Sequence, residues 1–216
     1  MPKYDICLFD MDGVLTDSKE GIINSVKFAL DFMGVAMPDG AKLEKFIGPP
    51  IRRGFEELGI DDAKMEETVA LYRKYLVDKG MFENALYPGI VKTLEELKQN
   101  GVIMAVATSK VAVYAKEILK YFQIDHYFSL VSGSEMDGRR SDKAEIIAYA
   151  LDKLDGEHKM SAVMIGDRKY DIAGARANGI DSIGAAWGYA EDGELQKADG
   201  TVIINSPEEI IKIVIN

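Results

Sequence analysis

The sequence predicts an α/β fold in which a parallel sheet is flanked by helices and a small all-helical domain is inserted after the first strand. Short apolar runs alternate with longer helical patterns over most of the 216 residues. This alternation is typical of a parallel sheet with crossover helices. More than ninety residues separate the first predicted strand from the second, and a single crossover needs far fewer.

Six short apolar runs are the predicted strands of this sheet. They are residues 4–9, 102–107, 127–131, 162–165, 182–185 and 201–204. After the Tyr87-Pro88-Gly89 turn signal, an amphipathic helix over 90–97 leads to the second strand.

The insert is predicted to be helical throughout. Apolar residues recur at helical spacing from Ile22 to Met33, and Asp17 with Glu20 resembles a capping box before them. Further helices are predicted over 43–47, 51–58 and 65–76. We therefore expect a core domain of residues 1–15 and 84–216 and a helical cap domain of residues 16–83.

Composition and charge exclude several classes of partner. The formal net charge of -10 repels the backbone of nucleic acids and anionic lipid surfaces, so neither is a predicted partner. Cys7 is the one cysteine and lies in an apolar run, which favours a buried, inert thiol over a nucleophile. Neither a secretory signal nor a membrane span of ~20 apolar residues is visible, so we expect a cytoplasmic protein.

Two acids follow the first predicted strand. Side chains two apart in an extended segment point to the same side, so Asp10 and Asp12 are expected to project together before Gly13 turns the chain. Neighbouring carboxylates repel unless a cation relieves them, and oxygen ligands suit Mg²⁺. Taken alone, a pair of solvated acids at a strand end is an equally good interpretation.

A second acid pair follows the strand over 162–165. Asp167 and Asp171 are four residues apart, which places them on one side of the helix expected there. Both acid pairs fall at carboxyl ends of strands, where open parallel sheets bind ligands. The alternative is that Asp167 and Asp171 only complement a helix dipole.

A hydroxyl and a lysine lie at equivalent places. Thr108 and Ser109 follow the second strand, where a hydroxyl and backbone N–H groups can hold phosphate oxygens. Helix capping would explain either residue as well. Lys143 opens a predicted helix, and a lysine at such a place is usually a surface charge.

Together these motifs carry a family resemblance. The segments LFDMDGVLTDS, AVATSK, Lys143 and MIGDRKYD resemble the haloacid dehalogenase-like phosphohydrolase superfamily, in particular its phosphoglycolate phosphatase-like branch. The resemblance extends over nearly the whole chain and implies a Rossmann-like core. Ser109 and Ala144 depart from the asparagine and proline frequent in that branch, which weakens any claim to phosphoglycolate itself.

The resemblance implies a role for each motif. Asp10 would be the nucleophile and Asp12 the proton donor and acceptor. Asp10, the Asp12 carbonyl and Asp167 would hold Mg²⁺, with Asp171 beside them. Thr108 and Lys143 would bind the phosphoryl group, and the predicted substrate contacts are Gly13, Thr108, Ser109, Lys143, Arg52 and Arg53.

Other residues are left with open interpretations. Arg52 and Arg53 lie either against substrate or in a solvated interhelical turn, while Trp187 and Tyr189 either stack on a base or pack in the fold. The basic residues near the motifs are expected to focus a positive cleft; they are Arg52, Arg53, Lys110, Arg139, Arg140, Lys143, Arg168 and Lys169. His126 and His158 lie outside every motif.

The sequence thus predicts a phosphatase of a small phosphorylated metabolite. Phosphoglycolate, a nucleoside monophosphate and a sugar phosphate all remain open as substrates. The alternatives are a phosphomutase with the same core residues and a regulatory module that binds phosphate without turnover. A dehalogenase has no need of Asp12, and a phosphonatase needs a cap lysine and lacks the second acid. The oligomeric state is not predicted.

Overall fold

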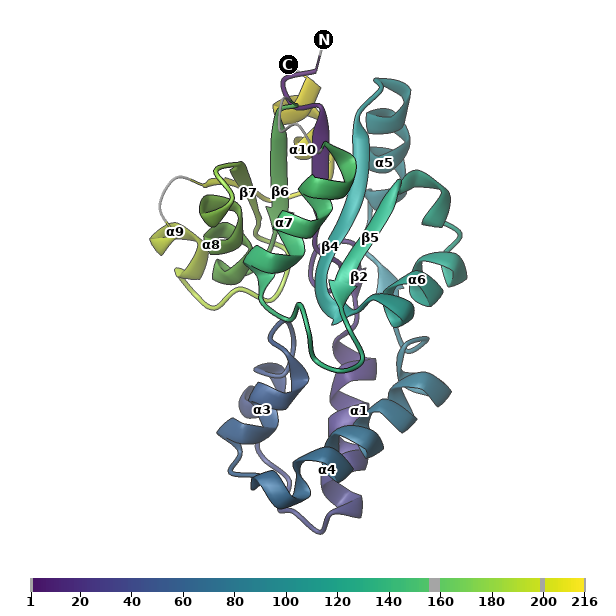
Figure 1. Cartoon of the computed structure of the whole chain (residues 1–216), viewed down its shortest axis with the longest axis vertical. Coiled ribbons are helices and arrows are strands. Elements are labelled where there is room, and N and C mark those ends of the chain that lie inside the picture. The colour runs from purple at the N-terminus through teal and green to yellow at the C-terminus, as the bar shows by residue number, and fades with distance from the viewer. Residues whose placement is uncertain (1, 156–159, 199–200, 216) are drawn as a thin grey trace. The chain divides into compact units, whose positions relative to one another are not determined.

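The computed structural model describes residues 2–155, 160–198 and 201–215. The chain divides into two compact units (Figure 1). The core unit comprises Met1–Thr16 and Leu86–Asn216, and the inserted unit comprises Asp17–Ala85.

A parallel sheet forms the centre of the core unit, which confirms the predicted α/β fold. Among the described residues it has six strands in the order β5-β4-β1-β6-β7-β8, and each neighbouring pair is parallel (Figure 1). The strands are β1 (Ile6–Phe9), β4 (Ile103–Val111), β5 (Leu130–Ser134), β6 (Ala162–Gly166), β7 (Asp181–Ala185) and β8 (Val202–Ile204).

Four of the predicted strands match the observed limits to within two residues at each end, and the other two are wrong by more than that. The predicted strand over 102–107 continues as β4 through Thr108, Ser109 and Lys110. The strand predicted over 127–131 begins instead at Leu130, because a short 3₁₀-helix, η2 (Asp125–Tyr127), precedes it. Phe128 contributes to the apolar run from outside β5, where its ring packs edge-on against Phe9.

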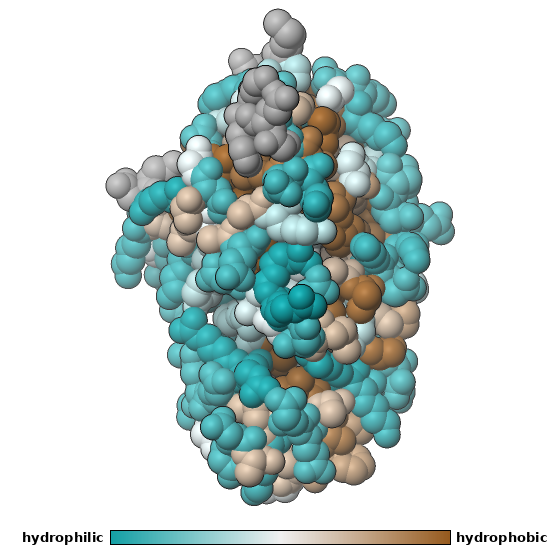
Figure 2. All heavy atoms as spheres, viewed as in Figure 1, coloured by the Kyte–Doolittle hydropathy of each residue, from teal (hydrophilic) through white to brown (hydrophobic). Residues whose placement is uncertain are grey.

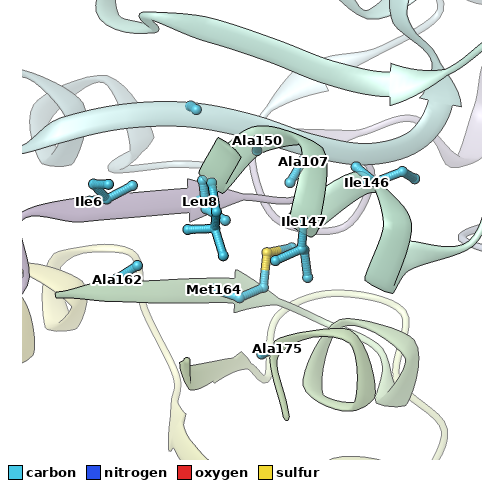
Figure 3. Close-up of a cluster of buried hydrophobic side chains, with 11 residues drawn as sticks. Ile6, Leu8, Ala107, Ile146, Ile147, Ala150, Ala162, Met164 and Ala175 are labelled. Atoms are coloured by element: carbon cyan, nitrogen blue, oxygen red, sulfur yellow. The ribbon is translucent and has the colours of Figure 1, made fainter. Parts of the chain in front are cut away.

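Helices surround the sheet and bury its apolar residues. They are α5 (Ile90–Gln99), α6 (Ala112–Tyr121), α7 (Lys143–Leu154), α8 (Lys169–Ala177), α9 (Glu194–Lys197) and α10 (Glu208–Ile215). Ile147 and Ala150 of α7 belong to one buried cluster with Leu8 of β1 and Met164 of β6 (Figure 3). This packing fixes the start of α7 beside the ends of the central strands.

The inserted unit is helical between its two linking strands. Its elements are α1 (Lys19–Phe32), α2 (Gly40–Glu44), α3 (Ile51–Glu57), α4 (Asp62–Tyr75) and a π-helical turn, η1 (Leu76–Gly80). The linking strands β2 (Thr16–Asp17) and β3 (Ala85–Leu86) pair with one another. The predicted capping box is wrong, because Ser18 is the N-cap of α1, and Asp17, which precedes the N-cap, accepts a hydrogen bond from the amide of Lys19, the first residue of the helix.

The exposed face of the molecule shown in Figure 2 is mostly hydrophilic, with apolar side chains in scattered places. Within the described ranges, no helix is both long enough and apolar enough to cross a membrane. Cys7 is fully buried in β1, and this burial raises the pKa of its thiol.

Candidate active site

The candidate site lies where the strand order of the sheet reverses. From β1 the chain adds β4 and then β5 on one side, and it returns to the other side of β1 with β6, β7 and β8. Open α/β sheets bind ligands outside the carboxyl ends of the strands at this switch point. Asp10 directly follows β1, and Asp167 directly follows β6.

Three carboxylates meet at this point. Asp10, Asp167 and Asp171 each present an oxygen within 4.8 Å of the others, and none of the three residues is more than 4% exposed. Asp171 reaches the group from the first turn of α8, where its Oδ2 accepts a hydrogen bond from the Arg168 amide at 3.0 Å. Asp171 therefore caps its helix and joins the cluster, whereas Asp167 precedes the helix.

Glycines make room for these acids. A Cβ atom on Gly13 would lie 2.1 Å from Asp167 Oδ2, and one on Gly188 would lie 2.3 Å from Asp167 Cβ. A Cβ atom on Gly166 would lie 2.1 Å from Asp171 Cβ. Gly13 also has φ +87°, a conformation that L side chains rarely adopt. The backbone thus closes tightly around Asp167 and Asp171.

Lys143 is the cation of the cluster. Its Nζ lies 2.8 Å from Asp10 Oδ2 and 2.8 Å from Asp171 Oδ1, and it donates to the Ala107 carbonyl at 3.1 Å. The contacts with the two acids are ion pairs, and the contact with the carbonyl is a hydrogen bond. Lys143 is only 6% exposed, so its interpretation as a surface charge is wrong.

Burial and crowding shift the acid–base properties of the cluster. Burial raises the pKa of Asp10 to about 6 although Lys143 opposes the shift. The pKa of Asp167 lies well above its ordinary value because of burial and of repulsion by Asp171 and Asp10. Burial alone would lower the pKa of Lys143, but its attraction to Asp10 and Asp171 raises it above the usual value.

Asp12 lies outside the carboxylate cluster and has a lysine of its own. Its Oδ2 is 3.0 Å from Lys110 Nζ, and the two side chains are 10% and 6% exposed. The sequence placed Lys110 only among the basic residues near the motifs. Its pairing with Asp12 was missed because Ser109 and Lys110 were expected after the strand, whereas they continue β4.

Thr108 and Ser109 are not helix caps. Val111 is the N-cap of α6 and makes no side-chain capping hydrogen bond. Thr108 is 1% exposed, and its hydroxyl accepts a hydrogen bond from the Lys110 amide at 3.2 Å. The Ser109 carbonyl accepts from the Ser134 hydroxyl at 2.9 Å. The Gly13 amide donates to the Thr16 carbonyl at 2.9 Å, which closes the turn after β1.

Most of the basic residues expected to focus a positive cleft are paired with acids. Besides Lys110 and Lys143, the pairs are Arg52–Glu66, Arg53–Glu57, Arg139–Asp137, Arg140–Glu135 and Arg168–Glu194. The acid partners therefore offset most of the charge of these cations, which argues against an unpaired positive surface around the motifs.

The loop after β7 supplies site residues that no motif indicated. The Tyr189 amide donates to Asp167 Oδ2 at 2.7 Å. Glu194 accepts from Arg168 Nε at 3.0 Å and from the Lys169 amide at 2.8 Å, which ties this loop to the start of α8. A glutamate some twenty-five residues from its partners leaves no local sequence signal.

Trp187, His126 and His158 are the other residues whose roles the sequence left open. Trp187 Nε1 donates to the Val14 carbonyl at 3.3 Å, and its ring meets Tyr87 edge-on. These contacts favour packing over base stacking for Trp187. His126 lies in η2, and His158 lies outside the described residues.

The chain is similar to known proteins over most of its length. Residues 7–185 match the sequence model of a family described as haloacid dehalogenase-like hydrolase. A 5′-nucleotidase from Pseudomonas aeruginosa is 44% identical over 197 residues, which cover 90% of this chain and 88% of that protein. The tyrosine-protein kinase PtkA from Mycobacterium tuberculosis is 36% identical over 201 residues, which cover 93% of this chain and 68% of that protein. A crystal structure described as a predicted phosphatase from Clostridium acetobutylicum has a TM-score of 0.90 and 41% identity, and the match covers 97% of each chain.

Proposed function

The chain belongs to the haloacid dehalogenase-like hydrolase family and is one of its phosphatases, and we propose that it hydrolyses a small phosphomonoester with Mg²⁺ through an aspartyl-phosphate. One observation carries the proposal. Asp10, Asp167 and Asp171 are buried together, and Lys143 forms ion pairs with Asp10 and Asp171. Three carboxylates and one ammonium leave two excess negative charges when all are ionised.

The donor set fits a hard divalent cation. Mg²⁺ takes carboxylate and carbonyl oxygens, and Asp167 Oδ1 is buried without a hydrogen-bond partner in the described part of the chain. We propose that Asp10, Asp167 and the Asp12 carbonyl hold the ion, with Asp171 beside them. A bound ion would offset the charge of the phosphoryl oxygens and orient them.

Asp10 and Asp12 divide the chemistry between them. A carboxylate oxygen of Asp10 attacks phosphorus, the bond to the leaving oxygen breaks, and Asp12 gives that oxygen its proton. Asp12 then takes a proton from a water molecule whose oxygen attacks the phosphorus of the aspartyl-phosphate. Inorganic phosphate leaves, Asp10 is restored as a carboxylate and Asp12 is protonated for the next cycle.

Thr108 and Lys143 are proposed to hold the phosphoryl oxygens. The transferring group spreads negative charge over its oxygens, and fixed donors stabilise that charge without having to reorganise. Lys143 is fixed by its contacts with Asp10, Asp171 and the Ala107 carbonyl. These contacts support a preorganised role for its ammonium group.

The proposed substrates are phosphoglycolate, nucleoside monophosphates and sugar phosphates. The relative from Pseudomonas aeruginosa is named a 5′-nucleotidase, so nucleoside monophosphates are the first class to test. Gly13 and Ser109, and Arg52 and Arg53 of the inserted unit, are proposed as further substrate contacts.

Phosphate release from a panel of these metabolites tests the proposal. We expect release with Mg²⁺ and its loss with EDTA, and we expect Asp10→Asn to lower kcat by at least about a thousandfold because no nucleophile remains. Lys120→Met, which removes an exposed cation of α6, is the matched control and should keep full activity. Retained turnover in Asp10→Asn would refute the nucleophile. An isomerised sugar phosphate without free phosphate would indicate a mutase, and binding without any turnover would indicate a regulatory module.

A further inference from the structure

We propose that Lys110 is a positioning residue that holds the Asp12 carboxylate for proton exchange with the leaving group. The inference rests on the proposed function, because it matters only if Asp12 gives its proton to the leaving oxygen. Lys110 would act through Asp12 and not on the substrate.

The contact between the two residues leaves one carboxylate oxygen available. Asp12 Oδ2 is held by Lys110 Nζ at 3.0 Å, and both side chains are nearly buried. Asp12 Oδ1 is also buried, and it has no hydrogen-bond partner among the residues that the structure describes. One oxygen is thus anchored while the other has no partner, an arrangement that suits an acid whose carboxylate must keep its position while it gives and takes a proton.

A bulge in β4 brings Lys110 to this place. Thr108 pairs with Gly133 of β5, and Val111 pairs with the next residue, Ser134. Ser109 and Lys110 are therefore extra residues without partners in the ladder of this strand pair. Bulges near active sites commonly re-aim a side chain, and this one sends Lys110 toward the turn after β1.

Neighbouring residues fix the bulge. The Lys110 amide donates to the Thr108 hydroxyl at 3.2 Å, and the Ser134 hydroxyl donates to the Ser109 carbonyl at 2.9 Å. A Cβ atom on Gly133 would lie 2.5 Å from the Lys110 carbonyl oxygen. Glycine at 133 thus allows the close approach that sets the backbone of Lys110.

Electrostatics explains why Asp12 needs a cation of its own. Asp12 lies two residues from Asp10, whose carboxylate belongs to the acidic cluster. A fourth carboxylate without a partner would be repelled by that cluster or drawn to a cation bound in it, and either movement would remove it from the leaving group. The ion pair with Lys110 keeps the Asp12 carboxylate apart from the cluster.

Leaving groups of different basicity provide the test. Protonation by a general acid matters for an alkyl phosphate, whose leaving alkoxide is strongly basic, and matters little for 4-nitrophenyl phosphate. We expect Lys110→Met to lower kcat/KM for an alkyl phosphate by about 10- to 100-fold and for 4-nitrophenyl phosphate by less than about threefold, as partial loss of general-acid catalysis predicts. Lys110→Arg should recover part of the alkyl activity, and Lys120→Met should change neither value.

The same assay on Asp12→Asn separates this inference from the proposed function. Equal losses on both substrates in Asp12→Asn would refute Asp12 as the general acid. If Asp12→Asn shows the leaving-group effect but Lys110→Met lowers both activities equally, Lys110 binds phosphate instead and the inference is overturned. We also expect Lys110→Met to cause little further loss in the Asp12→Asn background, because interacting residues are not additive. Circular dichroism checks folding, and Lys110→Gln replaces Lys110→Met if the latter does not fold.

Discussion

The ion pairs at the candidate site of the core unit are buried, whereas those of the inserted unit are exposed, as are other pairs of the core unit such as Lys120–Glu117 and Arg139–Asp137. In the core unit, the side chains of the pairs Lys143–Asp10, Lys110–Asp12 and Arg168–Glu194 are between 5% and 10% exposed. In the inserted unit, the side chains of Lys19–Glu44, Arg52–Glu66 and Arg53–Glu57 are between 46% and 79% exposed.

This difference indicates what each set of charges contributes. Removing charged groups from water is costly, and a buried pair often stabilises a fold less than apolar residues would. Stability therefore does not explain why the core unit keeps so many buried charges beside one sheet edge. Fixed charges in a dry site do explain it, because they stabilise a reacting phosphoryl group without reorganising.

Of the substitutions proposed here, Lys143→Met is expected to lower stability the most. The change leaves Asp10, Asp167 and Asp171 without the cation that contacts Asp10 and Asp171. We expect the free energy of unfolding at about pH 8 without metal to fall by about 3–5 kcal/mol, as when one partner of a buried pair is removed. Urea unfolding monitored by circular dichroism measures this value.

The control for this prediction removes one of the acids as well. Asp10→Asn combined with Lys143→Met should recover part of the lost stability, because fewer like charges remain buried together. Lys120→Met, an exposed cation in the same unit, should change stability by less than about 0.5 kcal/mol. A loss in Lys143→Met no larger than in Lys120→Met would show that the buried pair is not different from an exposed one.

The sequence predicted the cluster better than its surroundings, for a physical reason. Asp10 and Asp167 each follow a buried strand directly, and the carboxyl ends of neighbouring parallel strands must meet. Local pattern and sheet topology therefore suffice to bring these acids together. Gly188 and Glu194 approach the same site from a loop whose path no local pattern determines.

For the β4 bulge, in contrast, local pattern and sheet topology do not suffice to predict the conformation. Thr108, Ser109 and Lys110 have the polar residue types of a helix start, yet their backbone is held by Gly133 and Ser134 of the neighbouring strand. A contact between strands more than twenty residues apart decides the conformation, so hydrophobic period and capping rules could not predict it. The Lys110–Asp12 pair follows from that bulge and was missed with it.

Metal binding by the buried acids of the core unit should depend on pH. Burial raises the pKa of Asp10 to about 6 and raises that of Asp167, so the folded protein without metal retains protons that the unfolded chain has lost. The stability that Asp10 contributes is complete below its unfolded pKa of about 4 and is lost as pH rises through about 6, and the contribution of Asp167 is lost in the same direction. Mg²⁺ needs the deprotonated acids, so it should stabilise the protein more at high pH.

Thermal unfolding with and without millimolar MgCl₂ measures this effect. We expect a rise in Tm of several degrees at about pH 8 and a rise near zero at about pH 5, consistent with one to three kcal/mol of binding energy. KCl at matched ionic strength is the control, and Asp167→Asn should abolish the difference. Equal shifts at the two pH values would contradict metal binding by these acids.

The smallest effect on stability is expected for Arg52→Met in the inserted unit. Arg52 pairs with Glu66 on the surface, and the side chains are 47% and 79% exposed. Water therefore screens the pair, and the free energy of unfolding should change by less than about 0.5 kcal/mol.

Arg52 is also proposed to contact the substrate. KM for the preferred phosphomonoester should therefore rise by about 3- to 10-fold in Arg52→Met, because one solvent-screened charge contact is lost. Lys74→Met removes an exposed cation from α4 of the same unit and should change neither stability nor KM. If Arg52→Met instead destabilises the protein as strongly as Lys143→Met, an exposed ion pair contributes as much stability as a buried one. The proposed difference between the buried pairs of the site and the exposed pairs of the inserted unit would then be wrong.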